Sequence, residues 1–180
     1  MTNTTSTMRT QRTSGVIAAL AYIAAVVLAN VLSSRFGMVA VGFGFVASAG
    51  TYAAGASLGL KDLVREGLGA WGMVAVITVG STLSFILADP IIAIASLAAF
   101  GSSEVLDSLI YEPIRLRHKL TGVVVSNTFG GALDTWVFLS LAPFGPITGQ
   151  AFAGQMVGKV LWATLVPVAL IAIVRKVRAS

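Results

Sequence analysis

The stretch "ITVGSTLSFILADPIIAIASLAAF", Ile77 to Phe100, decides the fold class because two apolar runs meet there at one polar dipeptide. A helix that spans a bilayer needs about 20 mainly apolar residues. Both runs reach that length, from Gly67 to Ala88 and from Ile91 to Ile110. Proline disfavours a helical conformation in the residue before it, so Asp89-Pro90 predicts a tight hairpin between two helices.

The composition of the whole chain agrees with this interpretation. Of 180 residues, 56% are hydrophobic and 11% are charged, whereas a soluble domain carries roughly 25% charged residues. The chain has no cysteine, which excludes disulfides and thiolate metal sites, and one histidine, His118, in a basic cluster. We therefore expect no cofactor and no metal, and we interpret the net charge of +5 as a topology signal rather than as a nucleic-acid surface.

The apolar pattern predicts an all-α integral membrane protein with six transmembrane helices. A flexible cytoplasmic segment, 1–15, would precede a single transmembrane domain, 16–174, and a basic cytoplasmic tail, 175–180, would follow it. The six predicted spans are Val16–Leu32, Met38–Leu60, Gly67–Ala88, Ile91–Ile110, Thr121–Leu141 and Gln150–Val174.

The basic residues predict the orientation of these spans. Lysine and arginine are enriched in cytoplasmic loops, and only Arg35 would lie on the opposite side. Both termini are therefore expected in the cytoplasm, in a multi-pass membrane protein. The residues on the cytoplasmic side would be Arg9, Arg12, Lys61, Arg65, Arg115, Arg117, Lys119, Arg175, Lys176 and Arg178.

Polar side chains inside the predicted spans are the candidate functional residues, because charged groups in a bilayer are costly and usually face a cavity. They form one stripe on each of the last three spans, which predicts a shared cavity. Some have a second interpretation: Asn30 as a helix cap, Asp107 as a solvated helix end. The predicted substrate-binding residues are Glu104, Asp107, Asn127, Asp134, Gln155, Lys159 and Asn30.

Depth within the spans predicts which polar groups meet. At 1.5 Å per residue, Asp134 and Lys159 lie at a similar level in the outer half of the bilayer. They are candidate partners, as a binding site or as a structural ion pair. Glu104 and Asn127 would lie one layer below them.

Two further patterns allow more than one interpretation. In "KDLVREGLG", Lys61 to Gly69, charges of alternating sign predict either a solvated turn or a cytoplasmic gate that uses Asp62 and Glu66. The small residues Ala21, Ala25 and Ala29 lie four apart, which predicts close helix packing or a docking surface.

Four motifs together carry a resemblance. They are "LAN" (Leu28–Asn30), "KDLVREGLG" (Lys61–Gly69), "SEVLDSLIY" (Ser103–Tyr111) and "SNTFGGALDTWVF" (Ser126–Phe138). Their order and spacing resemble the vitamin uptake transporter family, also called the queuosine precursor transporter family, over roughly Ala29 to Lys159. The family's motif residues correspond to Asn30, Asp62, Glu66, Glu104, Asp107, Asn127 and Asp134.

The resemblance implies a six-helix inner-membrane importer of 7-cyano-7-deazaguanine or 7-aminomethyl-7-deazaguanine, and not an enzyme. A carboxylate can accept the two adjacent donors of a guanine-like edge, and an amide can donate to its carbonyl. The base could stack on Phe129, Phe138, Trp136 or Tyr52. The alternative is the substrate-binding subunit of an energy-coupling-factor vitamin transporter, so an energy-coupling partner and a homo-oligomer both stay open.

Overall fold

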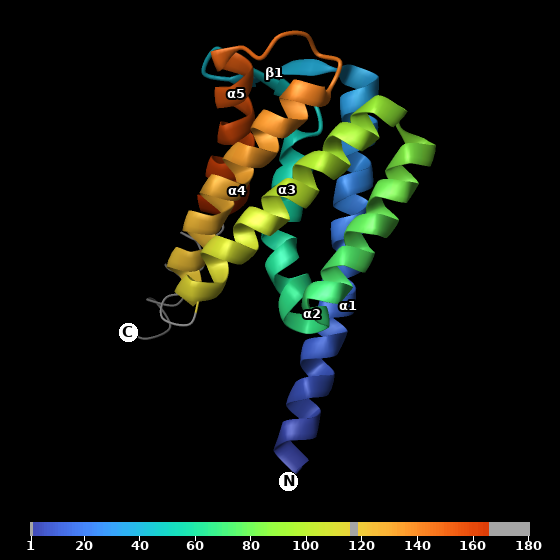
Figure 1. Ribbon diagram of the computed structural model, residues 1–180, viewed down its shortest axis with the longest axis vertical. Coiled ribbons are helices and arrows are strands. Elements are labelled where there is room, and N and C mark those ends of the chain that lie inside the picture. The colour runs from blue at the N-terminus through green and yellow to red at the C-terminus, as the bar shows by residue number, and fades with distance from the viewer. Residues whose placement is uncertain (1, 116–118, 166–180) are drawn as a thin grey trace.

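The computed structural model describes the backbone of residues 2–115 and 119–165, with side chains for 11–106, 109, 121, 122, 124, 125 and 127–161. As predicted, the chain is mostly helical. The helices are α1 (Thr2–Phe36), α2 (Thr51–Leu87), α3 (Pro90–Arg115), α4 (Lys119–Leu141), α5 (Gly149–Met156) and the π-helix η1 (Val157–Leu165). Two short strands, β1 (Met38–Gly42) and β2 (Phe45–Ser48), lie between α1 and α2 (Figure 1).

Two helices of the described chain are long and apolar enough to cross a membrane. They are Gln11–Phe36, within α1, and the whole of α2. A shorter apolar stretch, Pro90–Leu106, lies in α3. A helix that spans a bilayer must be long and apolar. These segments are therefore the ones whose length and composition indicate a membrane protein.

Helix α2 consists of two arms that meet at Gly69. This glycine has φ 73° and ψ −176°, a left-handed conformation that other residues rarely adopt. The chain reverses there, so the first arm descends and the second arm rises beside α1 (Figure 1). Each arm has about 18 residues and is roughly 27 Å long at the α-helical rise. The second arm matches the predicted third span, whereas the first arm overlaps the predicted second span only from Thr51 to Leu60.

The solvated-turn interpretation of "KDLVREGLG" is wrong for its first residues. The first arm of α2 continues through this segment as far as Gly69. Lys61 and Asp62 are only 4% and 6% exposed, whereas Glu66 is exposed. Burial of two opposite charges in adjacent positions means that the segment packs inside the helical bundle.

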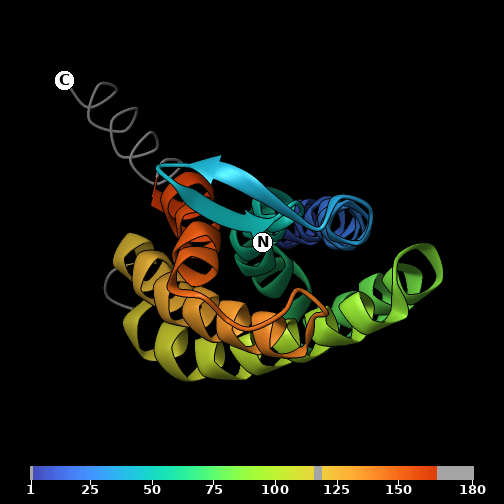
Figure 2. The same cartoon turned by 90° about the horizontal axis from the view of Figure 1, so that it is seen from above.

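The predicted helix Met38–Leu60 is wrong over its first part, where β1 and β2 form an antiparallel hairpin. The turn at Gly42, Phe43 and Gly44 has positive φ at all three residues, which a helix cannot accommodate. Alternating valine and phenylalanine also favour extended strands. Figure 2 shows the hairpin lying across the same end of the bundle as the start of α5.

The predicted hairpin at Asp89-Pro90 is confirmed. Helix α2 ends at Leu87 and α3 begins at Pro90. The Asp89 carboxylate oxygen Oδ1 accepts hydrogen bonds from the backbone N–H groups of Ile91 (2.9 Å) and Ile92 (3.2 Å), which caps α3. The Asp89 N–H donates to Ser34 Oγ of α1 at 2.9 Å, so the connection is tied to the end of α1.

Small residues bring the elements into backbone contact. A Cβ atom at Gly50 would overlap the Ala29 carbonyl oxygen of α1, and one at Gly154 would overlap the Val46 carbonyl oxygen of β2. Ala29 is buried in this packing, but Ala21 is exposed. The last member of the alanine stripe therefore packs within the bundle, as the close-packing interpretation predicts, whereas the first member is exposed.

Two apolar cores flank the centre of the molecule. One lies among α1, α2 and α3 and includes Tyr22, Met73 and Phe100. The other lies among α3, α4 and α5 and includes Ala95 and Phe138. Phe100 and Phe138, one from each core, both line a polar cavity, which therefore lies where the two cores meet.

Candidate functional site

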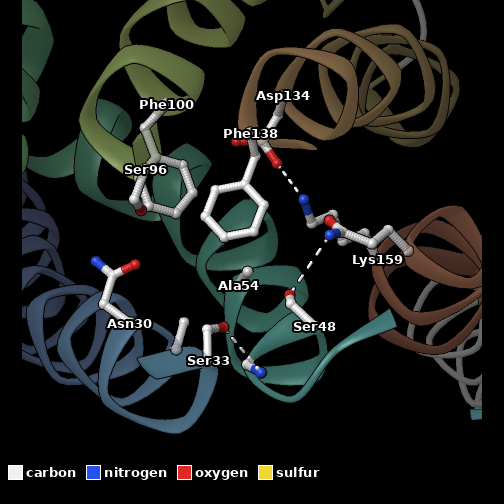
Figure 3. A pocket seen from close by; sticks show the side chains of 12 residues that line it. Asn30, Ser33, Ser48, Ala54, Ser96, Phe100, Asp134, Phe138 and Lys159 are labelled. Atoms are coloured by element: carbon white, nitrogen blue, oxygen red, sulfur yellow. Dashed lines mark hydrogen bonds and ion pairs between the residues drawn. The ribbon is translucent and has the colours of Figure 1, made fainter. Parts of the chain in front are cut away.

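The cavity draws its lining from α1, α2, α3, α4, α5, η1 and the end of β2. It is small, about 20 Å³, which is room for roughly one water molecule. Ligand pockets are usually about 300–1,000 Å³, so a ligand of that size could enter this cavity only if the cavity opened. The lining residues are Ala29, Asn30, Ser33, Ser48, Gly50, Ala54, Ser96, Phe100, Asp134, Phe138, Gln155 and Lys159 (Figure 3).

Asp134 and Lys159 are bonded to each other in this cavity, as their predicted depth required (Figure 3). Each residue is 2% exposed. The Lys159 ammonium also donates to Thr135 Oγ1 at 3.3 Å and lies 5.8 Å from the centre of the Phe138 ring. Burial of an ion pair is tolerated when further contacts of this kind satisfy the charges.

Lys159 is positioned by an unusual stretch of backbone. It lies in η1, and π-helical turns within helices occur frequently at functional sites. Gly158, the residue before it, packs so tightly on Thr51 that a Cβ atom there would overlap the threonine methyl group. The η1 backbone therefore approaches α2 closely and holds Lys159 toward α4.

Two neutral amides complete the polar lining, and each keeps one atom without a hydrogen bond. Asn30 is 2% exposed and its Nδ2 has no partner among the described residues. Gln155 is fully buried; its Nε2 donates to Ser48 Oγ at 3.5 Å, and its Oε1 has no partner in the described part of the chain. Buried polar groups are usually paired, so an orphaned donor and an orphaned acceptor at one cavity require an explanation.

A second set of charges lies below the cavity, toward Gly69. Arg65 of α2 and Glu104 of α3 form an ion pair at 3.2 Å, with side chains 15% and 16% exposed. Asn127 of α4 is fully buried, and Lys61 Nζ approaches Gly130 on the same helix. Neither Glu104 nor Asn127 lines the cavity.

The predicted site residues thus divide into groups. The cavity brings together Asn30, Asp134, Gln155 and Lys159. Asp62 is buried and Glu66 is exposed, both on the first arm of α2. The side chain of Asp107 lies outside the described residues.

Some lining residues carried no prediction. Ser96 and Phe100 lie on α3 at positions i and i+4, on the face that continues to Glu104, so the polar stripe could have been extended upward from the sequence. Ser33 and Ser48 gave no periodic signal. Their hydroxyls bond to the Gly50 N–H (3.2 Å) and the Thr51 hydroxyl (3.0 Å), respectively.

The aromatic side chains proposed for stacking are mostly turned away from the cavity. Tyr52, Phe129 and Trp136 are 46%, 58% and 57% exposed. Only Phe138 of that set lines the cavity, where Phe100 joins it. Among the described residues, no three histidine, cysteine, aspartate or glutamate side chains lie close enough together to hold a metal ion.

Comparison with known protein families matches residues 12–174 to the family described as "putative vitamin uptake transporter". The chain belongs to this family. The vitamin uptake transporter model covers α1 from Arg12 onward and every described element after it, and it agrees with the resemblance found in the sequence motifs. Family and apolar helices together identify a membrane transport protein. Comparisons with the curated proteins and with the solved structures gave no significant match.

Proposed function

We propose that this transporter imports a queuosine precursor, 7-cyano-7-deazaguanine or 7-aminomethyl-7-deazaguanine, across the bacterial inner membrane. One observation carries the proposal. A buried cavity at the meeting point of the two cores holds an orphaned amide donor on Asn30 and an orphaned amide acceptor on Gln155. A deazaguanine offers both a ring carbonyl and several N–H groups, so it can satisfy both atoms when the cavity opens.

The remaining lining supports the same class of ligand. Lys159 bonds Oδ2 of Asp134, so the other carboxylate oxygen can accept an N–H group of a guanine-like edge. Phe100 and Phe138 offer apolar faces to a flat ring. Asn30, Asp134, Gln155 and Lys159 are therefore the proposed substrate-binding residues in the cavity. Glu104, Asp107 and Asn127 stay proposed contacts of a lower layer, which a ligand would pass on its way to the cytoplasm.

The proposed topology has six spans with both termini in the cytoplasm. Helix α1, the two arms of α2, α3, α4 and the continuous α5–η1 segment run alternately up and down the long axis (Figure 1). An even number of passes returns the chain to the side on which it began. Lys61 is buried and Arg65 half-buried within α2, so they no longer count as loop charges, but the basic residues that remain still favour this orientation.

A gate is proposed below the cavity. Arg65 and Glu104 join α2 to α3, and the residues proposed for gating, Asp62 and Glu66, lie within a turn of Arg65. In the closed arrangement this layer separates the cavity from the end of the bundle at Gly69. Opening would require the α2–α3 ion pair to break, which makes these residues the proposed cytoplasmic gate.

The experiment that tests the function is uptake by a bacterial strain that lacks deazaguanine synthesis and its own importer. The strain would carry only this gene, and the uptake of each labelled deazaguanine would be compared with that of an empty-vector strain. Accumulation above the empty-vector level is expected. Equal accumulation in the two strains, with the protein present in the membrane, would contradict the proposal.

The same strain separates a self-sufficient importer from a substrate-binding subunit. If the host also lacks energy-coupling-factor subunits, uptake by this gene alone excludes the need for an ATPase partner. Uptake that appears only when coupling subunits are added would support the energy-coupling alternative.

A further inference from the structure

The charges that face the cavity cancel. Of the residues that line it, Asp134 and Lys159 are the charged ones, and they are bonded to each other. Below the cavity, the buried Lys61 and Asp62 carry opposite charges, and Arg65 and Glu104 are paired at 3.2 Å. The cavity therefore presents no net charge to a ligand in its closed arrangement.

Lys159 occupies the position that a ligand cation would need. Its ammonium is bonded to Asp134, bonded to Thr135 Oγ1 at 3.3 Å, and lies over the Phe138 ring. The side chain is 3% exposed, so it is held in place on all sides by protein. A ligand carrying a positive charge would have to displace this ammonium from Asp134 or remain uncompensated in a dry cavity, and both are unfavourable.

The lining atoms that lack a hydrogen bond among the described residues belong to neutral groups. Asn30 Nδ2 is an amide donor and Gln155 Oε1 is an amide acceptor, and neither has a partner among the described residues. Three serine hydroxyls, of Ser33, Ser48 and Ser96, also line the wall. Such a set recognises a ligand by its neutral donors and acceptors rather than by charge.

We propose that Lys159 is a specificity-determining residue: as the resident counter-ion of Asp134, it restricts the cavity to neutral ligands. The inference rests on the proposed function and refines it. The two precursors differ in charge, because a nitrile is neutral, whereas a primary alkyl amine is an ammonium ion near pH 7. The wild-type protein therefore prefers the nitrile, and removal of the resident cation shifts the preference toward the amine.

The test is competition for uptake in the strain described above. Labelled 7-cyano-7-deazaguanine is supplied with increasing unlabelled 7-aminomethyl-7-deazaguanine, and the reverse pair is also measured. For the wild-type protein we expect a preference for the nitrile of about a hundredfold or more, the scale of an uncompensated buried ion. In Lys159→Gln, Asp134 is left to pair with the amine, so the preference should fall by about tenfold or more, or reverse.

A second variant keeps the test decisive where Lys159→Gln does not reach the membrane. Gln155→Glu leaves the Asp134–Lys159 pair intact and adds a carboxylate to the cavity wall, where the Ser48 hydroxyl can donate to it. It should shift the preference in the same direction. Arg35→Gln is the matched control, because it removes a cation at the exposed end of α1 and should keep the wild-type ratio.

Each outcome is informative. A wild-type protein that takes up the amine as well as the nitrile, or either cavity variant with the wild-type ratio, would overturn the role of Lys159 while deazaguanine import stands. Uptake of neither compound by the wild-type protein would overturn the import proposal itself, and with it this refinement.

Discussion

The guanidinium of Arg65 on α2 lies 3.2 Å from the carboxylate of Glu104 on α3, about one helical turn below Phe100 of the cavity wall. This ion pair ties the first arm of α2 to the helix that follows its second arm. Glu104 has no basic neighbour within a turn on its own helix, so its partner comes entirely from the folded arrangement.

Neutralising Glu104 should therefore act on stability and on transport. Glu104→Gln leaves Arg65 without its counter-charge, and we expect a loss of about 1–3 kcal/mol of unfolding free energy. The exchanged pair, Arg65→Glu with Glu104→Arg, should recover part of this loss. Thermal unfolding of the detergent-solubilised variants gives the stability, and deazaguanine uptake gives the function. If the exchanged pair is less stable than Arg65→Glu alone and Glu104→Arg alone, the two residues are not coupled.

Breaking the Asp134–Lys159 pair should be more costly, because both residues are almost fully buried. Lys159→Met or Asp134→Asn alone leaves one uncompensated charge, with an expected cost of about 3–5 kcal/mol. The double neutral variant should recover folding, measured as the amount of folded protein in the membrane. Uptake then separates the roles: it returns with the fold if the pair is only structural and stays lost if Asp134 binds the ligand.

Asn30 should matter for transport and little for stability. Its Nδ2 is buried without a hydrogen bond among the described residues, so Asn30→Ala removes an unsatisfied donor, which by itself costs about 1–3 kcal/mol to bury. We expect an unfolding temperature no lower than that of the wild type and at least about tenfold weaker uptake. A variant that is clearly destabilised and still transports normally would make Asn30 a structural residue.

Gly50 should not tolerate even one methyl group. In Gly50→Ala the new Cβ would overlap the Ala29 carbonyl oxygen, and a backbone atom cannot move aside as a flexible side chain can. We expect a loss of about 1–3 kcal/mol or more. Gly101→Ala is the matched control, because no atom lies within 4 Å of its new Cβ, and alanine favours a helix by about 1 kcal/mol. Equal stability of the two variants would contradict the close packing of α1 on α2.

The proposed topology can be tested with single cysteines, because the chain contains none. A cysteine at Phe43, which is 77% exposed at the tip of the hairpin, should react from outside intact cells with a membrane-impermeant maleimide. A cysteine at the exposed Ser14 should react only after the cells are opened. Labelling of both positions from the same side would exclude the alternating six-span arrangement.

The sequence by itself determined the features that depend on local pattern. Apolar run length set the helical class, and the short-range effect of Pro90 placed the hairpin at Asp89, because both act between near neighbours along the chain. The pairing of Asp134 with Lys159 was also predictable, because a fixed rise per residue converts position in a helix into depth. The depth of a residue along its helix can therefore be estimated from the sequence alone.

Tertiary structure alone decided the features that depend on lateral arrangement. Depth does not specify which helices are neighbours, so the partner of Glu104 and the burial of Lys61 could not be derived. A short apolar run is also compatible with either a helix or a buried strand. Residues Met38 to Ser48 form a hairpin because three successive residues with positive φ reverse the chain and because β2 packs on Gly154 of α5, a contact that only the folded bundle provides.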